Sequence, residues 1–194
     1  VFMNVTLEHL EFHKTFDQYK NDKANLFRAL DKHNHIKTIA GVPTKINSIG
    51  IVNLEDPSFV DFINATNHQV YGYTSLGKAG KAAVENSAPI FLPEIPTNTH
   101  VMTATDIVSA SDGISFNVNA MDKNSHFTDE SEQTSFSVNA KLPGAFNAYN
   151  LMASIIAVSS VTDLSFEQVA AQVPNVLPIK GRMTVINEGQ DFEV

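Results

Sequence analysis

"SIGIVNLEDPSFVDFINATNHQVYGYTSL", residues 48–76, decides the fold class because it holds a strand, a helix and a second strand in succession. The run SIGIVN is apolar and too short for an amphipathic helix, so we expect a buried strand. In LEDPSFVDFINAT, Asp56 is the expected helix cap, and Pro57 falls at the first helical position, where proline is best tolerated. HQVYGYTSL is expected to form the next strand.

The residues before this stretch extend the same alternation. VFMNV, residues 1–5, is typical of a short strand, and a helix is expected over about 15–31 because apolar side chains recur there at steps of three and four. Residues 33–48 contain Gly41 and Pro43 as breakers and are expected to form a polar connector. Strands that alternate with helices in this way are typical of a parallel α/β sheet.

The middle of the chain changes character. Residues 77–98 have no clean period and contain three prolines, so we expect an irregular segment. Residues 101–121 and 134–144 alternate apolar and polar side chains, with the turn signal SDG at 111–113. This pattern predicts antiparallel hairpins.

The last third predicts two helices and a hairpin-like end. One helix is expected over about 147–159, and a second begins near Ser165, which stands at capping-box spacing from Gln168. We therefore expect an α/β fold with a partial parallel sheet, flanking helices and a small antiparallel β subdomain. The expected parts of this one domain are a parallel part at about 1–76, an antiparallel part at about 99–142, and a helical and hairpin end at about 143–194.

Composition narrows the class of protein. With 194 residues, the chain is long enough for one domain with a substantial core. A formal net charge of -8 argues against a nucleic-acid binder, and the absence of cysteine excludes disulfides and thiolate metal sites. No apolar run approaches the roughly 20 residues of a membrane span, and no signal peptide is recognised, so a cytoplasmic protein is expected.

Lys23 occupies an unexpected position in the helix expected over 15–31. The spacing places it in the middle of an apolar stripe formed by Phe12, Phe16, Tyr19, Leu26, Phe27 and Leu30. Because burial disfavours the charged form of an amine, a lysine there can act as a nucleophile, form a Schiff base or take up carbon dioxide as a carbamate. It can also snorkel, with its stem on the stripe and its ammonium in water. Periodicity leaves both interpretations open.

His9 and His13 are four residues apart and would share a face of a helix, with Glu8 and Glu11 nearby. The zincin motif requires a glutamate directly after the first histidine, where Leu10 stands instead. That motif is therefore excluded, and a solvated or capping histidine pair is the plain alternative.

Amide side chains mark a candidate ligand site. In LPGAFNAYN, residues 142–150, Asn147 and Asn150 stand three apart at a helix start, so they share a face and can present donors and acceptors to a heterocycle. Asparagine is also a common N-cap. Asn53 follows the strand SIGIV at the carboxyl end, where open parallel sheets bind ligands. Arg182, in KGRM, is a candidate phosphate contact.

Taken together, five ordered blocks resemble the Mur ligase family. Within it they are most similar to the branch that adds the third amino acid to UDP-N-acetylmuramoyl dipeptide, the tripeptide synthetases. The blocks are NVTLEHLEFH…YKNDKANLF, GIVNLEDP, ATDIVSASDGISFNV, LPGAFNAYN and KGRMTVINEGQDFEV. The resemblance covers most of the chain, and the connector at 33–48 and residues 77–98 match least.

The resemblance implies a fragment of the central ATPase domain of such a ligase. The family's phosphate-binding loop is expected upstream of Val1, and the strand with its ribose-binding aspartate after Val194, so the fragment alone is expected to be inactive. The implied cofactors are ATP and Mg²⁺. The implied reaction forms an acyl phosphate on the nucleotide-linked peptide, which lysine or diaminopimelate then attacks in peptidoglycan synthesis.

The resemblance also implies roles for single residues. His9 would sit in a magnesium site, with Asn4 and Glu8 in support, and Lys23 would be carbamoylated and act as a metal-binding anion. The side chains implied around adenine are Asn53, Asn147 and Asn150, and Arg182 is the one implied at the ATP phosphates.

This chain departs from the family's pattern at three places. Glu8 stands where aspartate is usual, Ala145 replaces an arginine or histidine, and Asn53-Leu54-Glu55-Asp56 is a loose version of Asn-x-Asp-Asp. A divergent ligase with another acceptor therefore stays open.

Two other classes stay open as well: a noncatalytic α/β binding module and a histidine-cluster metallohydrolase. The expected partners of a ligase are the UDP-muramoyl peptide and the amino acid. If strands of the parallel sheet precede Val1, an unpaired edge would be exposed, and self-association through it is expected.

Overall fold

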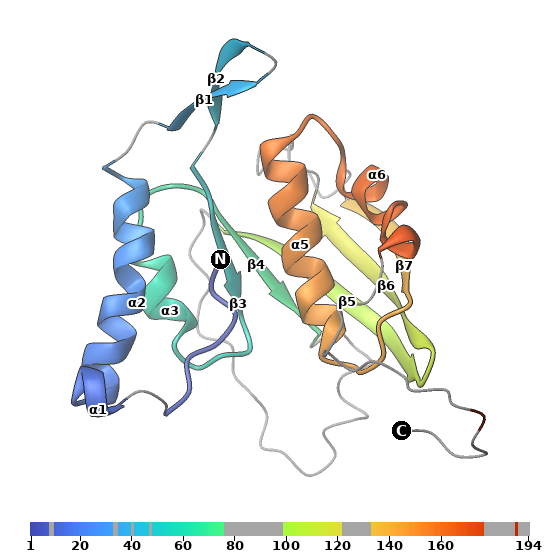
Figure 1. The fold of residues 1–194 in the computed structure, drawn as a ribbon, viewed down its shortest axis with the longest axis horizontal. Helices are drawn as coiled ribbons and strands as arrows, with labels where there is room; N and C mark the ends of the chain where they lie inside the picture. The colour runs from blue at the N-terminus through green and yellow to red at the C-terminus, as the bar shows by residue number, and fades with distance from the viewer. Residues whose placement is uncertain are drawn as a thin grey trace.

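The computed structural model describes residues 1–7, 10–32, 35–39, 41–46, 48–75, 99–121, 133–176 and 189. Its centre is a five-stranded mixed sheet with the order β3-β4-β5-β6-β7 (Figure 1). The strands are β3 (Gly50–Asn53), β4 (Val70–Thr74), β5 (Thr99–Ala110), β6 (Gly113–Met121) and β7 (Gln133–Ala140). The pairs β3–β4 and β4–β5 are parallel, and β5–β6 and β6–β7 are antiparallel. The α/β class predicted from the sequence is confirmed.

The strand β5 joins the parallel and antiparallel halves into one sheet. Its first residues, Thr99–Thr103, pair with β4, whereas Met102–Ala110 pair with β6 along the other edge. With twelve residues, β5 is long enough to serve both neighbours. The β5–β6 hairpin therefore extends beyond the carboxyl ends of β3 and β4.

Helices cover both faces of the parallel half. In Figure 1, α2 (Phe16–Leu30) and α3 (Phe59–Ile63) lie together beside β3 and β4, while α5 (Asn147–Val161) crosses the sheet with α6 (Phe166–Ala170) beside it. Val52 and Val70 belong to the core under α2 and α3, whereas Ile51 and Tyr71 face the core under α5 and α6. Successive strand residues point to opposite faces, so each short strand supplies both cores.

In the part of the chain that the structure describes, helices cover the antiparallel half on one face only. In β6, Phe116 and Val118 are buried, whereas the alternate residues Asn117 and Asn119 are exposed. An antiparallel sheet can leave one face in water in this way.

The helix expected over 15–31 is confirmed as α2. Its N-cap is Thr15, whose hydroxyl accepts a hydrogen bond from the Gln18 amide at 3.2 Å. Tyr19 and Phe27 are buried as the stripe predicts. A short helix, α1 (Leu10–His13), precedes it.

The predicted apolar stripe is wrong at two positions, Phe12 and Leu26, which are exposed. Phe12 is 80% exposed, because it belongs to α1, and Lys14, with a φ of 65°, turns the chain between α1 and α2. Leu26 is 72% exposed. It precedes the buried Phe27 by one position, which places it about 100° around the helix and toward solvent.

The connector expected over 33–48 is instead a β-hairpin. Its strands are β1 (His35–Ile39) and β2 (Val42–Ile46), and Gly41 adopts a φ of 83° in the turn between them. The hairpin projects from the body of the protein between α2 and β3 (Figure 1).

The N-terminal run and Asp56 also differ from expectation. Phe2 forms a single parallel bridge with Val52 rather than a full strand. The α3 helix begins at Phe59, with Ser58 rather than Asp56 at its N-cap. The Asp56 carboxylate instead accepts hydrogen bonds from the amides of Val5 at 2.9 Å and Ser58 at 2.8 Å, so it ties the N-terminal segment to this turn.

The remaining helices agree with the sequence. The α5 helix begins at Asn147, and Ser165 and Gln168 form the predicted capping box of α6. A 3-10 turn, η2 (Val173–Asn175), follows. The irregular segment at 77–98 and the C-terminal hairpin lie outside the described residues, apart from Gly189. None of the described helices is long and apolar enough to cross a bilayer.

Candidate nucleotide site

Asn53 is the last residue of β3 and stands at the carboxyl edge of the parallel strands, as predicted. Its backbone amide donates to the Phe2 carbonyl at 3.0 Å. Its side-chain oxygen Oδ1 accepts from the Glu55 amide at 3.0 Å, which closes an Asx turn. The Asn53 side chain is therefore oriented by its own loop.

Asn147 and Asn150 share a face of α5, as their spacing predicts. The amide Nδ2 of Asn150 donates to Oδ1 of Asn147 at 3.0 Å, and Nδ2 of Asn147 donates to the Pro143 carbonyl at 2.7 Å. Neither asparagine is the N-cap, because that position belongs to Phe146. Capping therefore does not account for this pair.

Glu55 joins β3, β4 and α5 through hydrogen bonds at this edge of the sheet. This role was not predicted from the sequence. Its carboxylate accepts four hydrogen bonds, from Thr74 Oγ1 at 3.0 Å, from the Ser75 amide at 2.5 Å, from Ser75 Oγ at 3.0 Å and from Tyr149 Oη at 2.8 Å. Ser75 Oγ also lies 2.7 Å from Tyr149 Oη. We call Glu55, Thr74, Ser75 and Tyr149 the carboxylate clasp, because they join the ends of β3 and β4 to the first turn of α5.

The two tyrosines at this edge stay protonated over the physiological range. Burial raises the pKa of Tyr149, and Glu55 raises it further, whereas the Ser75 hydrogen bond opposes the shift. The pKa of Tyr73 is well above its ordinary value, chiefly through burial and then through the charges of Glu55 and Tyr149. Tyr149 therefore acts as a hydrogen-bond donor to Glu55, and the Tyr73 hydroxyl donates to Met3 Sδ at 2.9 Å.

Lys23 lies in the middle of α2, half-buried between Tyr19 and Phe27 on the helix surface. Its Nζ atom is 4.8 Å from the centroid of the Tyr19 ring. A lysine over an aromatic face is typical of a cation–π contact, so the geometry is compatible with the snorkelling interpretation. Carbamoylation of Lys23 stays a prediction.

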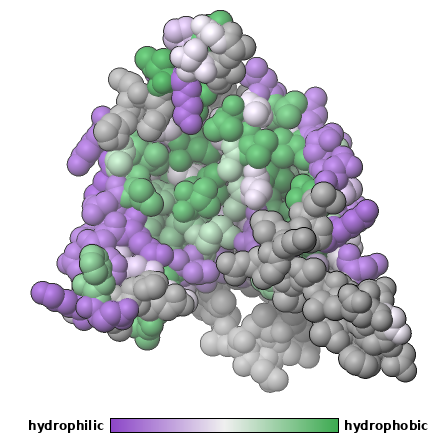
Figure 2. Space-filling view, viewed as in Figure 1, coloured by the Kyte–Doolittle hydropathy of each residue, from purple (hydrophilic) through white to green (hydrophobic). Residues whose placement is uncertain are grey.

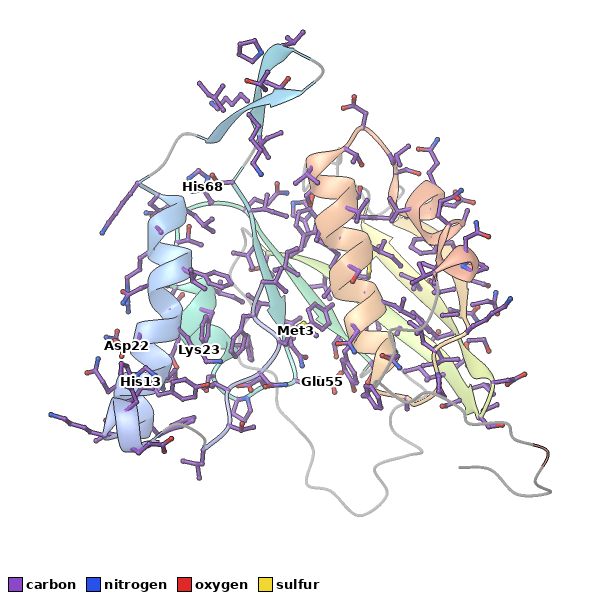
Figure 3. The ribbon with its side chains drawn as sticks, in the orientation of Figure 1. Met3, His13, Asp22, Lys23, Glu55 and His68 are labelled. Atoms are coloured by element: carbon purple, nitrogen blue, oxygen red, sulfur yellow. The ribbon has the colours of Figure 1, made fainter. Side chains whose placement is uncertain are left out.

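A histidine, His13, contacts the Tyr19 ring that lies beneath Lys23. Its Nδ1 is 2.9 Å from Asp22 Oδ2, and its ring centroid is 4.7 Å from that of Tyr19. Figure 3 shows His13, Asp22 and Lys23 close together along the amino-terminal half of α2, in the lower half of the view, where Glu55 also lies. The His13–Tyr19 contact thus connects an imidazole–carboxylate pair to the ring beneath Lys23.

Several predicted site residues cannot be placed. His9, Glu8 and Arg182 lie outside the described residues, and Asn4 is exposed in the N-terminal segment. Within the described ranges, no group of three histidine, aspartate or glutamate side chains could hold a metal ion. The structure describes all three amides of the predicted adenine site, whereas of the predicted magnesium site it describes Lys23 and Asn4 but not His9 and Glu8.

Polar side chains at the carboxyl ends of parallel strands are where open α/β sheets bind ligands. The chain matches the family model of the Mur ligase middle domain over residues 1–158. The chain belongs to the Mur ligase family, which confirms the resemblance found in the sequence.

Relatives share similarity over the whole chain. This chain is 42% identical to a UDP-N-acetylmuramyl-tripeptide synthetase of Treponema denticola and 36% identical to one of Treponema pallidum, in each case over its full length. It spans 31% and 34% of those two proteins, about a third of their length.

Solved structures share the fold. A crystal structure of MurF from Acinetobacter baumannii superposes with a TM-score of 0.59 at 16% identity, covering 96% of this chain and 31% of that one. The ligase structure from the same organism titled UDP-N-acetylmuramoylalanyl-D-glutamyl-2,6-diaminopimelate--D-alanyl-D-alanyl ligase gives 0.61 over 96% and 30%. At this identity the likeness supports the architecture alone.

Proposed function

We propose that this chain is part of the central domain of an ATP-dependent ligase that joins lysine or diaminopimelate to UDP-N-acetylmuramoyl-L-Ala-D-Glu. The names of the Treponema relatives support this substrate class. The observation that carries the proposal is the link between the end of β3 and α5: the Glu55 amide donates to Asn53 Oδ1, and the Glu55 carboxylate accepts from Tyr149 on the first turn of α5. The two elements that bear the three amides are thereby bound to one another.

The donor set at this edge fits a nucleotide base. Amide side chains offer neutral donors and acceptors in a fixed plane, as the edge of adenine requires. Asn53, Asn147 and Asn150 would hold the base, and Arg182 would contact the phosphates. In the magnesium site, Lys23 as a carbamate and His9 would be ligands, supported by Asn4 and Glu8. Bound magnesium would supply positive charge that offsets the phosphate oxygens.

The proposed reaction has two steps. An oxygen of the peptide carboxylate attacks the γ-phosphorus of ATP, and ADP leaves. The amine of the incoming amino acid then attacks the acyl carbon, and phosphate leaves. Such a reaction draws on cytoplasmic ATP, and the 194-residue fragment by itself is proposed to be inactive. A divergent ligase with another acceptor would use the same edge.

A second candidate is a noncatalytic α/β module that keeps the fold. The contact of Lys23 with the Tyr19 ring favours this module, because a lysine held there as a cation is positively charged, whereas a metal-binding carbamate is negatively charged.

Self-association is part of the proposal. Figure 2 shows a broad apolar surface, hollowed between α2 and α5, around the N-terminal end of the chain. Val1 is 63% exposed there. We infer that two copies can cover this surface. No nucleic-acid or membrane partner is proposed.

ADP release tests the function. The chain is extended to the length of its relatives and mixed with UDP-N-acetylmuramoyl dipeptide, magnesium, ATP, and either lysine or diaminopimelate. Release that depends on one amino acid is expected. ATP binding with no release for either would favour another acceptor, and a folded protein with no ATP binding would favour the noncatalytic module.

A further inference from the structure

The β1–β2 hairpin is a surface that the proposed function does not use. It lies in the stretch, residues 33–48, where the sequence resembles the family least, and its two strands form a sheet of their own. Figure 1 shows it projecting from the body just before β3, at the amino end of that strand, whereas Asn53 is the last residue at the carboxyl end. A partner bound to the hairpin would therefore leave the candidate nucleotide edge open.

The two outer edges of the hairpin differ in their capacity to pair with another strand. Thr38 stands opposite Pro43, and proline has no N–H to donate. This pair is therefore one of those that exchange no hydrogen bonds across the hairpin. Because such pairs alternate along an antiparallel ladder, Ile36–Lys45 is another. The peptide groups of Ile36 and Thr38 thus point away from β2.

The outer edge of β1 is open, whereas that of β2 is blocked. Ile36 and Thr38 each present an N–H and a C=O along the edge of β1. On the edge of β2, Pro43 offers no donor, and a proline on an edge strand is a common device against further pairing. A strand that adds to the hairpin would therefore pair with β1.

The side chains around this edge are basic and aliphatic. Residues 32–54 contain three lysines and no aspartate or glutamate, in a chain with a net charge of -8. Lys37 and Lys45 are exposed and form no ion pair with a described residue. Ile36 is 65% exposed, and Val42 is 62% exposed. This surface suits a ligand that combines negative charge with aliphatic side chains.

We propose that the outer edge of β1 binds an extended, acidic segment of a second protein, which adds to the hairpin as an antiparallel strand. Backbone hydrogen bonds to Ile36 and Thr38 supply the pairing, and an acidic residue opposite Lys37 supplies the charge contact. Ile36 and Lys37 point to opposite faces, so the segment alternates acidic with β-branched residues. A second copy of this chain does not fit this edge, because pairing two β1 strands would bring their lysines together.

Peptide binding tests the proposal. The probe is a capped heptapeptide of alternating valine and glutamate, titrated into the isotope-labelled 194-residue chain at low micromolar concentration. We expect saturable shifts of the β1 amide resonances and slower hydrogen exchange at the amides of Ile36 and Thr38. A peptide of alternating valine and lysine should not bind.

A third peptide separates strand pairing from charge. Alternating proline and glutamate keeps every acid but removes the N–H groups of the residues that would stand opposite Ile36 and Thr38. We expect this peptide not to bind. Affinity equal to that of the valine–glutamate peptide would overturn strand addition.

Lys37→Glu changes the charge at the edge and leaves the backbone unaltered. It should weaken the valine–glutamate peptide about tenfold and create binding of the valine–lysine peptide. Lys141→Glu is the matched control, since it makes the same change of net charge at an exposed position after β7 and should leave the affinity unchanged. Equal losses in the two variants would reduce the effect to general attraction and overturn the proposal.

Thr38→Pro closes the edge itself. It removes the outward N–H of Thr38 without removing a hydrogen bond within the hairpin, since Thr38 faces Pro43, and it should abolish peptide binding. Thr38→Ser keeps the N–H and should keep the affinity.

Two further measurements separate this proposal from others. Binding to phosphatidylglycerol vesicles, with none to the valine–glutamate peptide, would overturn it in favour of a lipid surface. ADP release by the full-length ligase should be equal in wild type and Lys37→Glu, because the hairpin lies at the opposite end of β3 from Asn53. A lower rate in that variant would contradict the assignment of the hairpin to partner binding alone.

Discussion

At the scale of single residues, Lys23 illustrates what spacing can and cannot predict. Periodicity correctly placed it between Tyr19 and Phe27, because those side chains lie four positions away on either side. The state of its amine depends on what faces it from other segments, and periodicity contains no such information. The Tyr19 ring is the neighbour that the structure adds.

Lys23→Ala tests the carbamate. In the full-length ligase we expect ligation to fall about a hundredfold or more, because a preorganised charge at the phosphates is lost. Wild-type activity should rise with added bicarbonate, and the variant should not respond. Lys20→Ala is the matched control, since Lys20 lies on the same helix and forms a partly exposed ion pair with Asp61 at 2.9 Å. Equal rates in wild type and Lys23→Ala, with or without bicarbonate, would exclude the role.

Asp31 gives a pH prediction. The Thr66 hydroxyl, and then the amide and side chain of Asn67, lower the pKa of Asp31. A carboxylate with a lowered folded-state pKa stabilises the fold above its unfolded-state pKa of about 3.9, and this contribution disappears as pH falls through the folded-state value.

Asp31→Asn should therefore lower the urea midpoint at pH 7, and the difference from wild type should shrink steadily below about pH 4. Asp163→Asn, at an exposed position after α5, serves as the control and should show no such trend. A pH-independent difference for Asp31→Asn would mean that shape rather than charge matters there.

At the scale of elements, local signals predicted α2, α5, the capping box of α6 and the β5–β6 turn. The hairpin of β1 and β2 was missed because Pro43 and Gly41 interrupt a short run with little apolar alternation. Asp56 was assigned to the wrong role because Val5, its partner, lies 51 positions away in sequence. Residues that bond across such separations leave no local pattern.

Asp56→Ala tests that correction. Asp56 is 8% exposed, and removing its carboxylate leaves the amides of Val5 and Ser58 without an acceptor. We expect the free energy of unfolding to fall by about 2–4 kcal/mol in urea titration. Asp56→Asn keeps one acceptor oxygen and should lose roughly half as much. If Asp56 only capped α3, the loss would be about 1 kcal/mol, the usual value of a cap.

At the scale of the whole molecule, topology creates the candidate site. The position of Asn53 at a strand end and the spacing of Asn147 and Asn150 could be predicted from the sequence. The bond between Glu55 and Tyr149 could not, because it joins residues 94 positions apart. Only the packing of α5 across the ends of β3 and β4 brings them together.

The edge of the sheet formed by β3 also results from the topology of the whole molecule. Phe2 pairs with Val52 through one bridge, so this side of the sheet has little strand pairing beyond β3 in the described residues. The adjoining surface between α2 and α5 is apolar (Figure 2). A sheet edge next to apolar surface favours pairing with another chain.

We therefore expect this 194-residue chain to form dimers or larger species at high micromolar concentration, measured by light scattering. Val1→Lys places a charge at this edge and should shift the distribution toward monomer, because desolvating the ammonium opposes association. Leu26→Lys is the control: Leu26 is 72% exposed on the outer face of α2, and its replacement should leave association unchanged. A monodisperse monomer for the unmodified chain, or equal effects of both variants, would show that the edge does not drive association. If the edge does drive it and the longer chain supplies strands that pair with β3, extension of the chain to the length of its relatives should abolish association.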